Sequence, residues 1–223
     1  MENVTAQPLD QNARIEQLGQ ALPLTGVAFA ALTLAGFLLM GKNPEPDTPI
    51  ATVKNYWSTH HSHVLTAGTI LAYGAVLFAI FTLAVWARIR REALHPAVAG
   101  GALLGGAVTT AGLLASAGTY YTLGDIANAP TTLPAALQAL HLSGTELSLP
   151  IAGGVELLLL AVAVAGLARR AFPRWLAWTA LPIGILQLTP IGFQAFLLFM
   201  LWTAAAGIAM TVRPATPTRP PRN

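Results

Sequence analysis

Long apolar runs separated by short polar segments recur along the chain. Six of them approach the roughly 20 residues that an α-helix needs to cross a hydrocarbon core about 30 Å thick. They cover residues 21–41, 63–87, 96–119, 149–168, 175–190 and 193–212. The pattern predicts an all-α fold, a polytopic transmembrane helical bundle of six spans. Five spans are the alternative, because only the turn signal LTPIG at 188–192 divides the last two runs.

Composition supports lipid as the main solvent of the chain. Hydrophobic residues make up 54% of the sequence and charged residues only 9%, whereas roughly a quarter of an ordinary soluble domain is charged. About twenty mixed polar residues with three acids precede the first apolar run, so we expect that run to be a membrane helix and not a cleaved signal peptide. The chain has no cysteine, which excludes disulfides, thiolate metal sites and a cysteine nucleophile.

Arginine and lysine predict the orientation in the membrane. Ten of these residues fall before the first span or after the second, fourth and sixth, and only Lys42 and Lys54 fall in the other loops. Basic loops are retained in the cytoplasm, so both termini are expected to be cytoplasmic in a multi-pass protein of the cell membrane. The basic charge is explained by this orientation and by contact with membrane lipids, and no aromatic-interleaved basic face indicates nucleic acid.

The predicted spans form one transmembrane domain, residues 1–212, with two sizeable outer loops at 42–62 and 120–148. In the second loop, the segment around Pro134 is typical of a turn followed by a short amphipathic helix. The residues at 213–223 are basic and proline-rich, lack apolar side chains to bury, and are expected to form a disordered cytoplasmic tail.

Several short motifs give a resemblance to a group of proteins. They are PEPDTP (44–49), VKNYWSTH (53–60), the arginine cluster after the second span, and PRWLAW (173–178). In these motifs and in overall layout the chain resembles the six-span integral membrane proteins of actinobacterial type. The resemblance covers most of the chain and implies the six-span fold, but it implies no activity.

Glu156 is the strongest candidate for a ligand-binding residue. It lies about 10 Å below the predicted outer surface, where an ionised carboxylate costs about 2.5 kcal/mol or more. We expect it to face the bundle interior, with Gly153 one turn away on the same face giving a neighbour close access. Polar residues of the outer half are its candidate hydrogen-bond partners: Tyr73, Gln187, Gln194 and His141. A purely structural carboxyl group, hydrogen-bonded between helices, is the alternative interpretation.

The outer histidines are weaker candidates for a metal site. His60 and His63 are three residues apart and can share a helical face, and His141 lies on the other outer loop. However, no HExxH or similar ligand spacing is present, and histidines are common where a helix leaves the membrane. We therefore predict no metal and no haem, and no other cofactor.

Two further patterns concern packing. Gly101-x-x-x-Gly105 has the spacing that allows two helices to approach closely, within the chain or between two copies in a homo-oligomer. Tryptophans near predicted span ends are typical of anchors in the membrane interface: Trp57, Trp86, Trp175 and Trp178.

These features favour a non-enzymatic membrane protein that binds a small or lipidic ligand, or a membrane or extracytoplasmic partner protein, through its outer half. Two alternatives stay open. One is a secondary transporter that uses Glu156 as a proton or cation site, and the other is a metal- or haem-bearing membrane enzyme that uses the outer histidines. No nucleophile elbow or phosphate-binding loop supports enzymes of other kinds.

Overall fold

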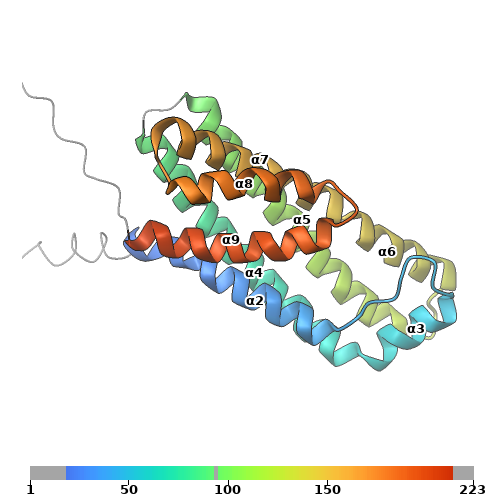
Figure 1. Ribbon diagram of the computed structural model, residues 1–223. Helices are drawn as coiled ribbons and strands as arrows, with labels where there is room; N and C mark the ends of the chain where they lie inside the picture. The colour runs from blue at the N-terminus through green and yellow to red at the C-terminus, as the bar shows by residue number, and fades with distance from the viewer. Residues whose placement is uncertain (1–18, 93–94, 213–223) are drawn as a thin grey trace, which may run out of the picture.

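The computed structural model describes residues 19–92 and 95–212, and every regular element within them is a helix. The tail at 213–223, predicted to be disordered, lies outside the described residues. Figure 1 shows a bundle formed by a 3₁₀ turn and eight α-helices: η1 (Leu22–Leu24), α2 (Thr25–Met40), α3 (Ile50–Thr59), α4 (His61–Arg91), α5 (Pro96–Asn128), α6 (Pro134–Glu146), α7 (Ser148–Arg169), α8 (Arg174–Gln187) and α9 (Gly192–Val212).

Five helical segments of the described chain are long and apolar enough to cross a membrane. They are Gly19–Met40, His61–Arg91, Pro96–Asn128, Pro134–Arg169 and Gly192–Val212. They cover the first four predicted spans, apart from residue 41, and the sixth. The fifth predicted span corresponds to α8, which has 14 residues and therefore extends about 21 Å. The predicted turn before α9 is present at 188–191.

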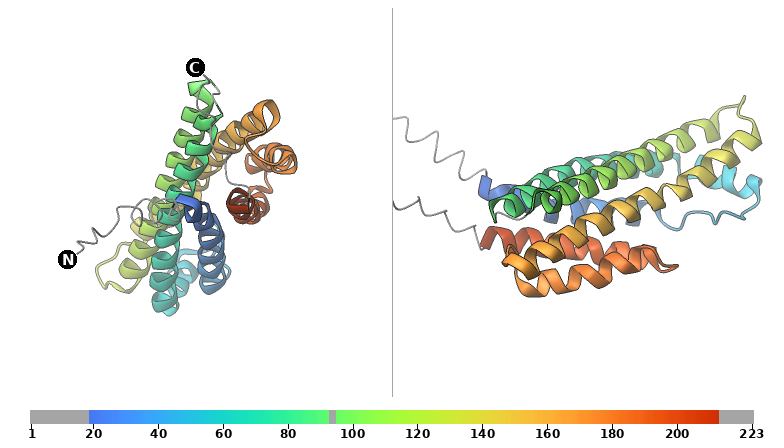
Figure 2. Two further views of the ribbon diagram at one scale, coloured as in Figure 1. Left: turned by 90° about the vertical axis from the view of Figure 1, so that its left-hand side faces the viewer. Right: turned by 90° about the horizontal axis from the view of Figure 1, so that it is seen from above.

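Six helices form a closed ring, in the order α2, α4, α5, α7, α8 and α9, and α9 packs back against α2. Figure 2 (left) shows this arrangement along the bundle axis. The centre of the ring is filled by side chains, because the Phe78 ring lies 4.9 Å from that of Phe29 and 5.7 Å from that of Phe199. All three phenylalanines are fully buried.

Both ends of the described chain lie at the same end of this ring (Figure 1). The carbonyl group of Pro23 lies against Gly207 near the end of α9. Arg88, near the end of α4, donates a hydrogen bond to the Met210 carbonyl at 3.5 Å. Six arginines gather at this end, which we call the arginine end: Arg88, Arg90, Arg91, Arg169, Arg170 and Arg174.

Glycines bring α5 and α7 into backbone contact. A Cβ atom on Gly105 would lie 2.5 Å from the Leu158 nitrogen and 2.6 Å from the Gly154 oxygen. Gly101, four residues earlier, also faces α7, with Leu157 3.7 Å from its Cβ position. The Gly101-x-x-x-Gly105 spacing therefore serves packing within the chain, one of the two uses expected for it.

The opposite end of the bundle carries a cap, formed by α3, α6 and the adjoining turns of α4 and α5 (Figure 2, right). The α5 helix continues to Asn128, beyond the end of the third predicted span at residue 119. Leu123 and Ala127 of this extension are buried in one cluster with Trp57 and Leu137. Packing against the cap thus sustains the helix beyond its apolar run.

The tryptophans divide into exposed and buried residues. Trp175 and Trp178 are 53% and 61% exposed near the arginine end, as expected of interface anchors. Trp57 is only 1% exposed, so its interpretation as an interface anchor was wrong. Its position beside a span end could not reveal that α6 covers it.

Candidate functional site

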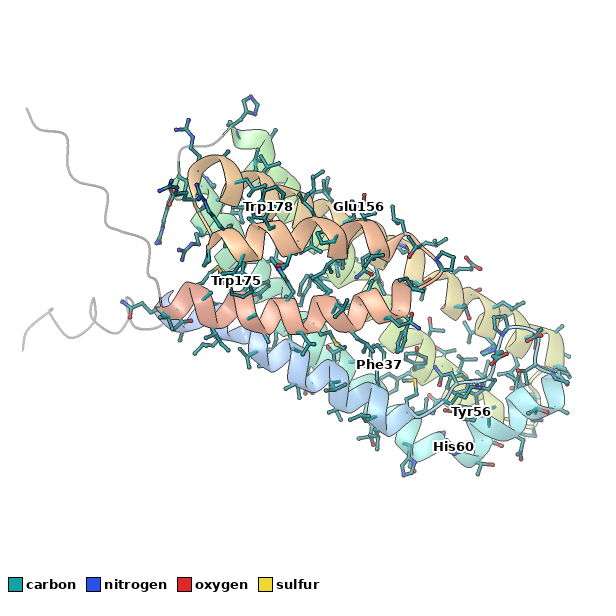
Figure 3. All side chains as sticks on the ribbon, in the orientation of Figure 1. Phe37, Tyr56, His60, Glu156, Trp175 and Trp178 are labelled. Carbon is teal, nitrogen blue, oxygen red and sulfur yellow. The ribbon has the colours of Figure 1, made fainter. Side chains whose placement is uncertain are left out.

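Glu156 lies on the side of α7 that meets α8 (Figure 3). Its Cα and Cγ atoms are 3.7 and 3.9 Å from the position that a Cβ atom on Gly184 would occupy. Gly153 is exposed and has no heavy atom within 4 Å of its Cβ position. The glycine that gives Glu156 a close neighbour is therefore Gly184 of α8, and not Gly153 as the sequence suggested.

The carboxylate group of Glu156 makes no hydrogen bond or ion pair with any described residue. The residue is half-buried, and residues one turn away on α7, Gly153 and Leu160, are exposed. Glu156 thus lies at the rim of the ring, between the α8 contact and the exposed face of α7, and does not face the bundle interior as predicted. It precedes Arg169 by 13 residues along a continuous helix, which places it about 20 Å from the arginine end.

The register of α7 and α8 brings the end of α8 to the level of Glu156. Gly166 contacts Ala177, and Leu159 contacts Gly184. One turn further along this antiparallel pair, Glu156 is level with Gln187, the last residue of α8. The turn that follows is apolar and surface-exposed, with Leu188 and Ile191 58% and 49% exposed.

The exposed face of α8 contains a second unusual acceptor. Pro182 lies inside the helix and has no N–H group, so the Trp178 carbonyl group receives no hydrogen bond from the residue four positions later. In a bilayer such a carbonyl needs a donor from elsewhere. The rim between α7 and α8 therefore presents the Glu156 carboxylate as an acceptor, and the exposed face of α8 presents this carbonyl group.

Of the candidate partners of Glu156, Gln187 lies at the same level, whereas the others lie on other helices. Gln187 is 6% exposed, and its Nε2 atom is buried without a hydrogen-bond partner. Tyr73 is 65% exposed on α4, and Gln194 is exposed on α9. Among the described residues, no hydrogen bond joins Glu156 to any of these residues or to His141.

His141 belongs instead to the buried part of the cap. Its ring lies 6.1 Å from that of Trp57, and neither the His141 Nε2 nor the Trp57 Nε1 atom has a hydrogen-bond partner in the described structure. Next to Trp57, the Tyr56 hydroxyl group donates a hydrogen bond to the Met40 carbonyl at 2.6 Å. Burial raises the pKa of Tyr56, and the neighbouring Tyr120 phenol raises it further, so Tyr56 is a neutral donor near pH 7.

The three adjacent histidines have separate surroundings. The rings of His60 and His63 are 6.5 Å apart, and the His60 ring stacks on Tyr56 at 4.6 Å. His61 Nδ1 donates to the Gly124 carbonyl at 3.1 Å. Within residues 19–92 and 95–212, no group of three histidine, aspartate or glutamate side chains is placed to hold a metal ion. His60, His63 and His141 are therefore not brought together as a metal-binding set.

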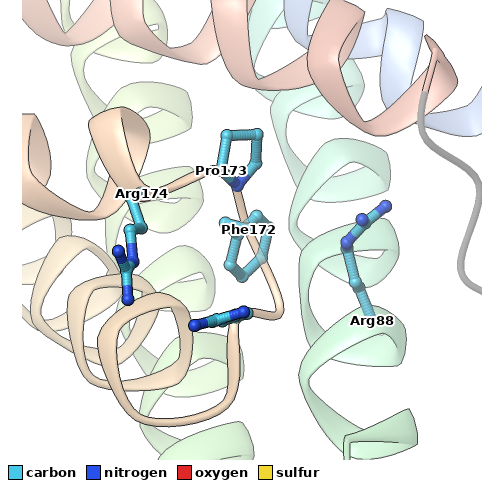
Figure 4. Close-up of a pocket in the computed structure, with 5 residues that line it drawn as sticks. Arg88, Phe172, Pro173 and Arg174 are labelled. Carbon is cyan, nitrogen blue, oxygen red and sulfur yellow. The ribbon is translucent and has the colours of Figure 1, made fainter.

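A pocket of about 290 Å³ opens at the arginine end, lined by Arg88, Arg170, Phe172, Pro173 and Arg174. Figure 4 shows Phe172 and Pro173 between Arg88 of α4 and Arg174 of α8. The arginines are clustered in the sequence, but on sequence alone this clustering indicates only the orientation in the membrane. The arginines on α4 and at the start of α8 are some eighty positions apart, so their meeting depends on the fold.

Comparisons with protein-family models, curated proteins and solved structures find no match to this chain.

Proposed function

We propose that this chain is a six-span protein of the cell membrane, with cytoplasmic termini, that binds a small or lipidic ligand through its outer half. In this proposal Glu156 is the principal acceptor, and the ligand carries a hydroxyl, amide or ammonium donor. Membrane lipids surround the bundle, and α8 is the fifth span. The protein acts by binding and not by catalysis.

The position of the described ends supports six spans. The two ends of the described chain lie at the same end of the ring (Figure 1), an arrangement that fits an even number of crossings. Five helices are long enough to span, and α8 runs antiparallel to both of its chain neighbours. The shortness of α8 is accommodated if the apolar turn at 188–191 lies within the outer leaflet.

The distribution of charge supports the orientation. The arginine end carries six arginines, and Glu92 is the one acidic residue described there. The cap carries Lys42 and Lys54 together with four acids, Glu45, Asp47, Asp125 and Glu146. A basic end retained in the cytoplasm places the cap outside.

The observation that carries the binding proposal is the unpartnered Glu156 carboxylate at membrane depth. A position about 20 Å from the arginine end is about 10 Å inside the outer boundary of a 30 Å core. Acidic residues at this depth generally face a partner or a cavity. Since the described chain supplies no donor to this carboxylate, we infer that a bound molecule does.

Packing at the centre of the ring favours binding over transport. A transporter site lies near a path that can open to both sides. In this ring the interior is occupied by stacked aromatic side chains, with Phe199 and Trp202 at a centroid distance of 6.4 Å. Glu156 lies outside this packed interior, at a rim that faces the membrane.

The proposal predicts that a hydrophobic carbodiimide, which partitions into lipid and modifies protonated carboxyl groups, labels Glu156 in purified protein stripped of lipid. We expect about one modification per chain, located by mass spectrometry, and none at this position in Glu156→Gln. Adding a lipid extract from the native membrane should slow the labelling, because the ligand and the reagent compete for the same carboxyl group.

Glu146→Gln is the matched control, since Glu146 is exposed at the end of α6 in the cap. This variant should be labelled at Glu156 like the original protein. Both variants should keep their thermal unfolding temperature, because surface changes of this kind usually alter stability by no more than about 0.5 kcal/mol. A folded, lipid-free protein whose Glu156 does not react would contradict an accessible carboxyl group at the rim. If native lipid does not slow the labelling of Glu156 but native membrane protein does, the bound molecule is a protein partner and not a lipid.

A further inference from the structure

We propose that the pocket at the arginine end binds a phosphate group, from an anionic phospholipid or from free phosphate. This site is separate from Glu156, about 20 Å away along α7. The pocket has a volume of about 290 Å³, and three of its five lining residues are arginines. Guanidinium groups suit phosphate because their N–H donors match its oxygens in pairs.

Arg88 lines this pocket and holds its other lining residues in place. Its Nε atom donates to the Ala171 carbonyl at 2.5 Å, and its guanidinium lies 5.7 Å from the centre of the Phe172 ring. Both contacts fix the segment that joins α7 to α8 against α4. Arg88 thereby holds in place the turn on which Arg170 and Arg174 stand.

Arg170 has a backbone conformation that positions its side chain beside the pocket. It ends α7 with φ at 58° and ψ at 28°, in the left-handed region, which costs a residue with a Cβ atom roughly 1–2 kcal/mol. Glycine is the usual residue at this position after a helix. The Arg170 guanidinium makes no hydrogen bond or ion pair with a described residue. We therefore attribute the arginine at this position to binding of a ligand by its side chain.

Arg174 begins α8 and is also exposed without a side-chain partner in the described structure. The first hydrogen bonds of α8 run from the Leu176 and Ala177 N–H groups to the Pro173 carbonyl. The N–H groups of Arg174 and Trp175 precede them and point out of the helix start, where an anion is favoured. Two exposed guanidinium groups and a helix N-terminus thus lie at one pocket.

The surroundings of the pocket fit a lipid headgroup in particular. Trp175 and Trp178 next to it are exposed, and tryptophan is enriched at headgroup depth. The apolar surface of α8 continues from them to Ile185, which is 64% exposed and can pack against acyl chains. Among the described residues, Glu92 at the end of α4 is the one acid at this end of the bundle, and it interacts electrostatically with Arg88.

The test compares Arg170→Gln/Arg174→Gln with the matched control Arg91→Gln/Arg169→Gln, which removes two exposed arginines of the same end that do not line the pocket. Each protein is placed in nanodiscs of dioleoyl phosphatidylcholine with a small fraction of dioleoyl phosphatidylglycerol, and retained lipid is counted by native mass spectrometry. The pocket variant should retain phosphatidylglycerol about 100-fold more weakly, because a hydrogen bond to a charged group contributes roughly ten-fold per arginine. A parallel arm measures inorganic phosphate binding by calorimetry in detergent.

Weaker binding by the pocket variant but not by the control supports the site. If lipid retention falls, the phosphate group belongs to a phospholipid, and if only inorganic phosphate binding falls, the ligand is free phosphate. Equally weakened binding in both variants overturns the proposal, because the arginines then act only as a diffuse positive surface. Unchanged binding of both lipid and phosphate in the pocket variant also overturns it. Arg174→Gln alone, expected to weaken lipid retention roughly ten-fold, provides the same comparison should the double variant not fold.

Discussion

Replacing Gly105 by leucine is expected to prevent the bundle from assembling. A Cβ atom at this position would lie 2.5 Å from the Leu158 nitrogen and 2.6 Å from the Gly154 oxygen. These are backbone atoms of α7, so relief requires the two helices to separate along their contact. Overpacking usually costs about 1–3 kcal/mol when side chains can adjust, and we expect a larger loss here. The yield of monodisperse protein and its thermal unfolding temperature measure the effect.

Gly100 provides the matched control on the same helix. It is exposed, and no heavy atom lies within 4 Å of its Cβ position. Gly100→Leu should keep its unfolding temperature and yield, since it adds an apolar side chain to a surface in contact with lipid. If Gly105→Leu proves as stable as Gly100→Leu, α5 and α7 do not pack as described.

Phe199→Ala is expected to lower the free energy of unfolding by roughly 3–5 kcal/mol. Phe199 is fully buried, and its ring lies near those of Phe78, Phe196 and Trp202, at 5.7, 5.9 and 6.4 Å. In a membrane the stability of such a cluster comes from close packing, because lipid chains are as apolar as the core. Removing the ring leaves a cavity among three helices. Heat-induced unfolding in detergent measures the loss.

Phe193→Ala serves as the comparison. Phe193 is 59% exposed at the start of α9 and contacts Phe37 at a ring distance of 5.8 Å. Truncating this ring should cost less than about 1 kcal/mol, as is usual for surface positions. Similar losses in both variants would indicate that the centre of the ring is not tightly packed.

Apolar run length predicted the long helices well, since crossing a bilayer demands a length that the sequence displays directly. Run length could not predict where a helix ends once it continues beyond its apolar run. The α5 helix extends to Asn128 because the cap covers Leu123 and Ala127, and that covering comes from segments distant in sequence. Run length also says little of α8, whose 14 residues fall below the length of an independent span.

The energetic cost of an acid in hydrocarbon singled out Glu156, but not its neighbours. Which residues meet a helix face depends on how the helices rotate and slide, and here close glycine contacts set that register, such as Gly166 against Ala177. This register puts Gly184 beside Glu156 and leaves Gly153 in the open. The partners proposed from depth alone, among them Tyr73 and Gln194, lie at the surface of other helices.

Cysteine accessibility measures the proposed arrangement of six spans with the arginine end in the cytoplasm. Because the chain has no cysteine, single cysteines introduced at exposed positions test it with a membrane-impermeant maleimide on intact cells. Cysteines at Lys54 and Thr131 in the cap should be labelled. Those at Arg91, Arg169 and Val212 should be labelled only after the cells are permeabilised. Labelling of Arg91→Cys or Arg169→Cys in intact cells would contradict the orientation, and labelling of Val212→Cys alone would contradict the sixth span.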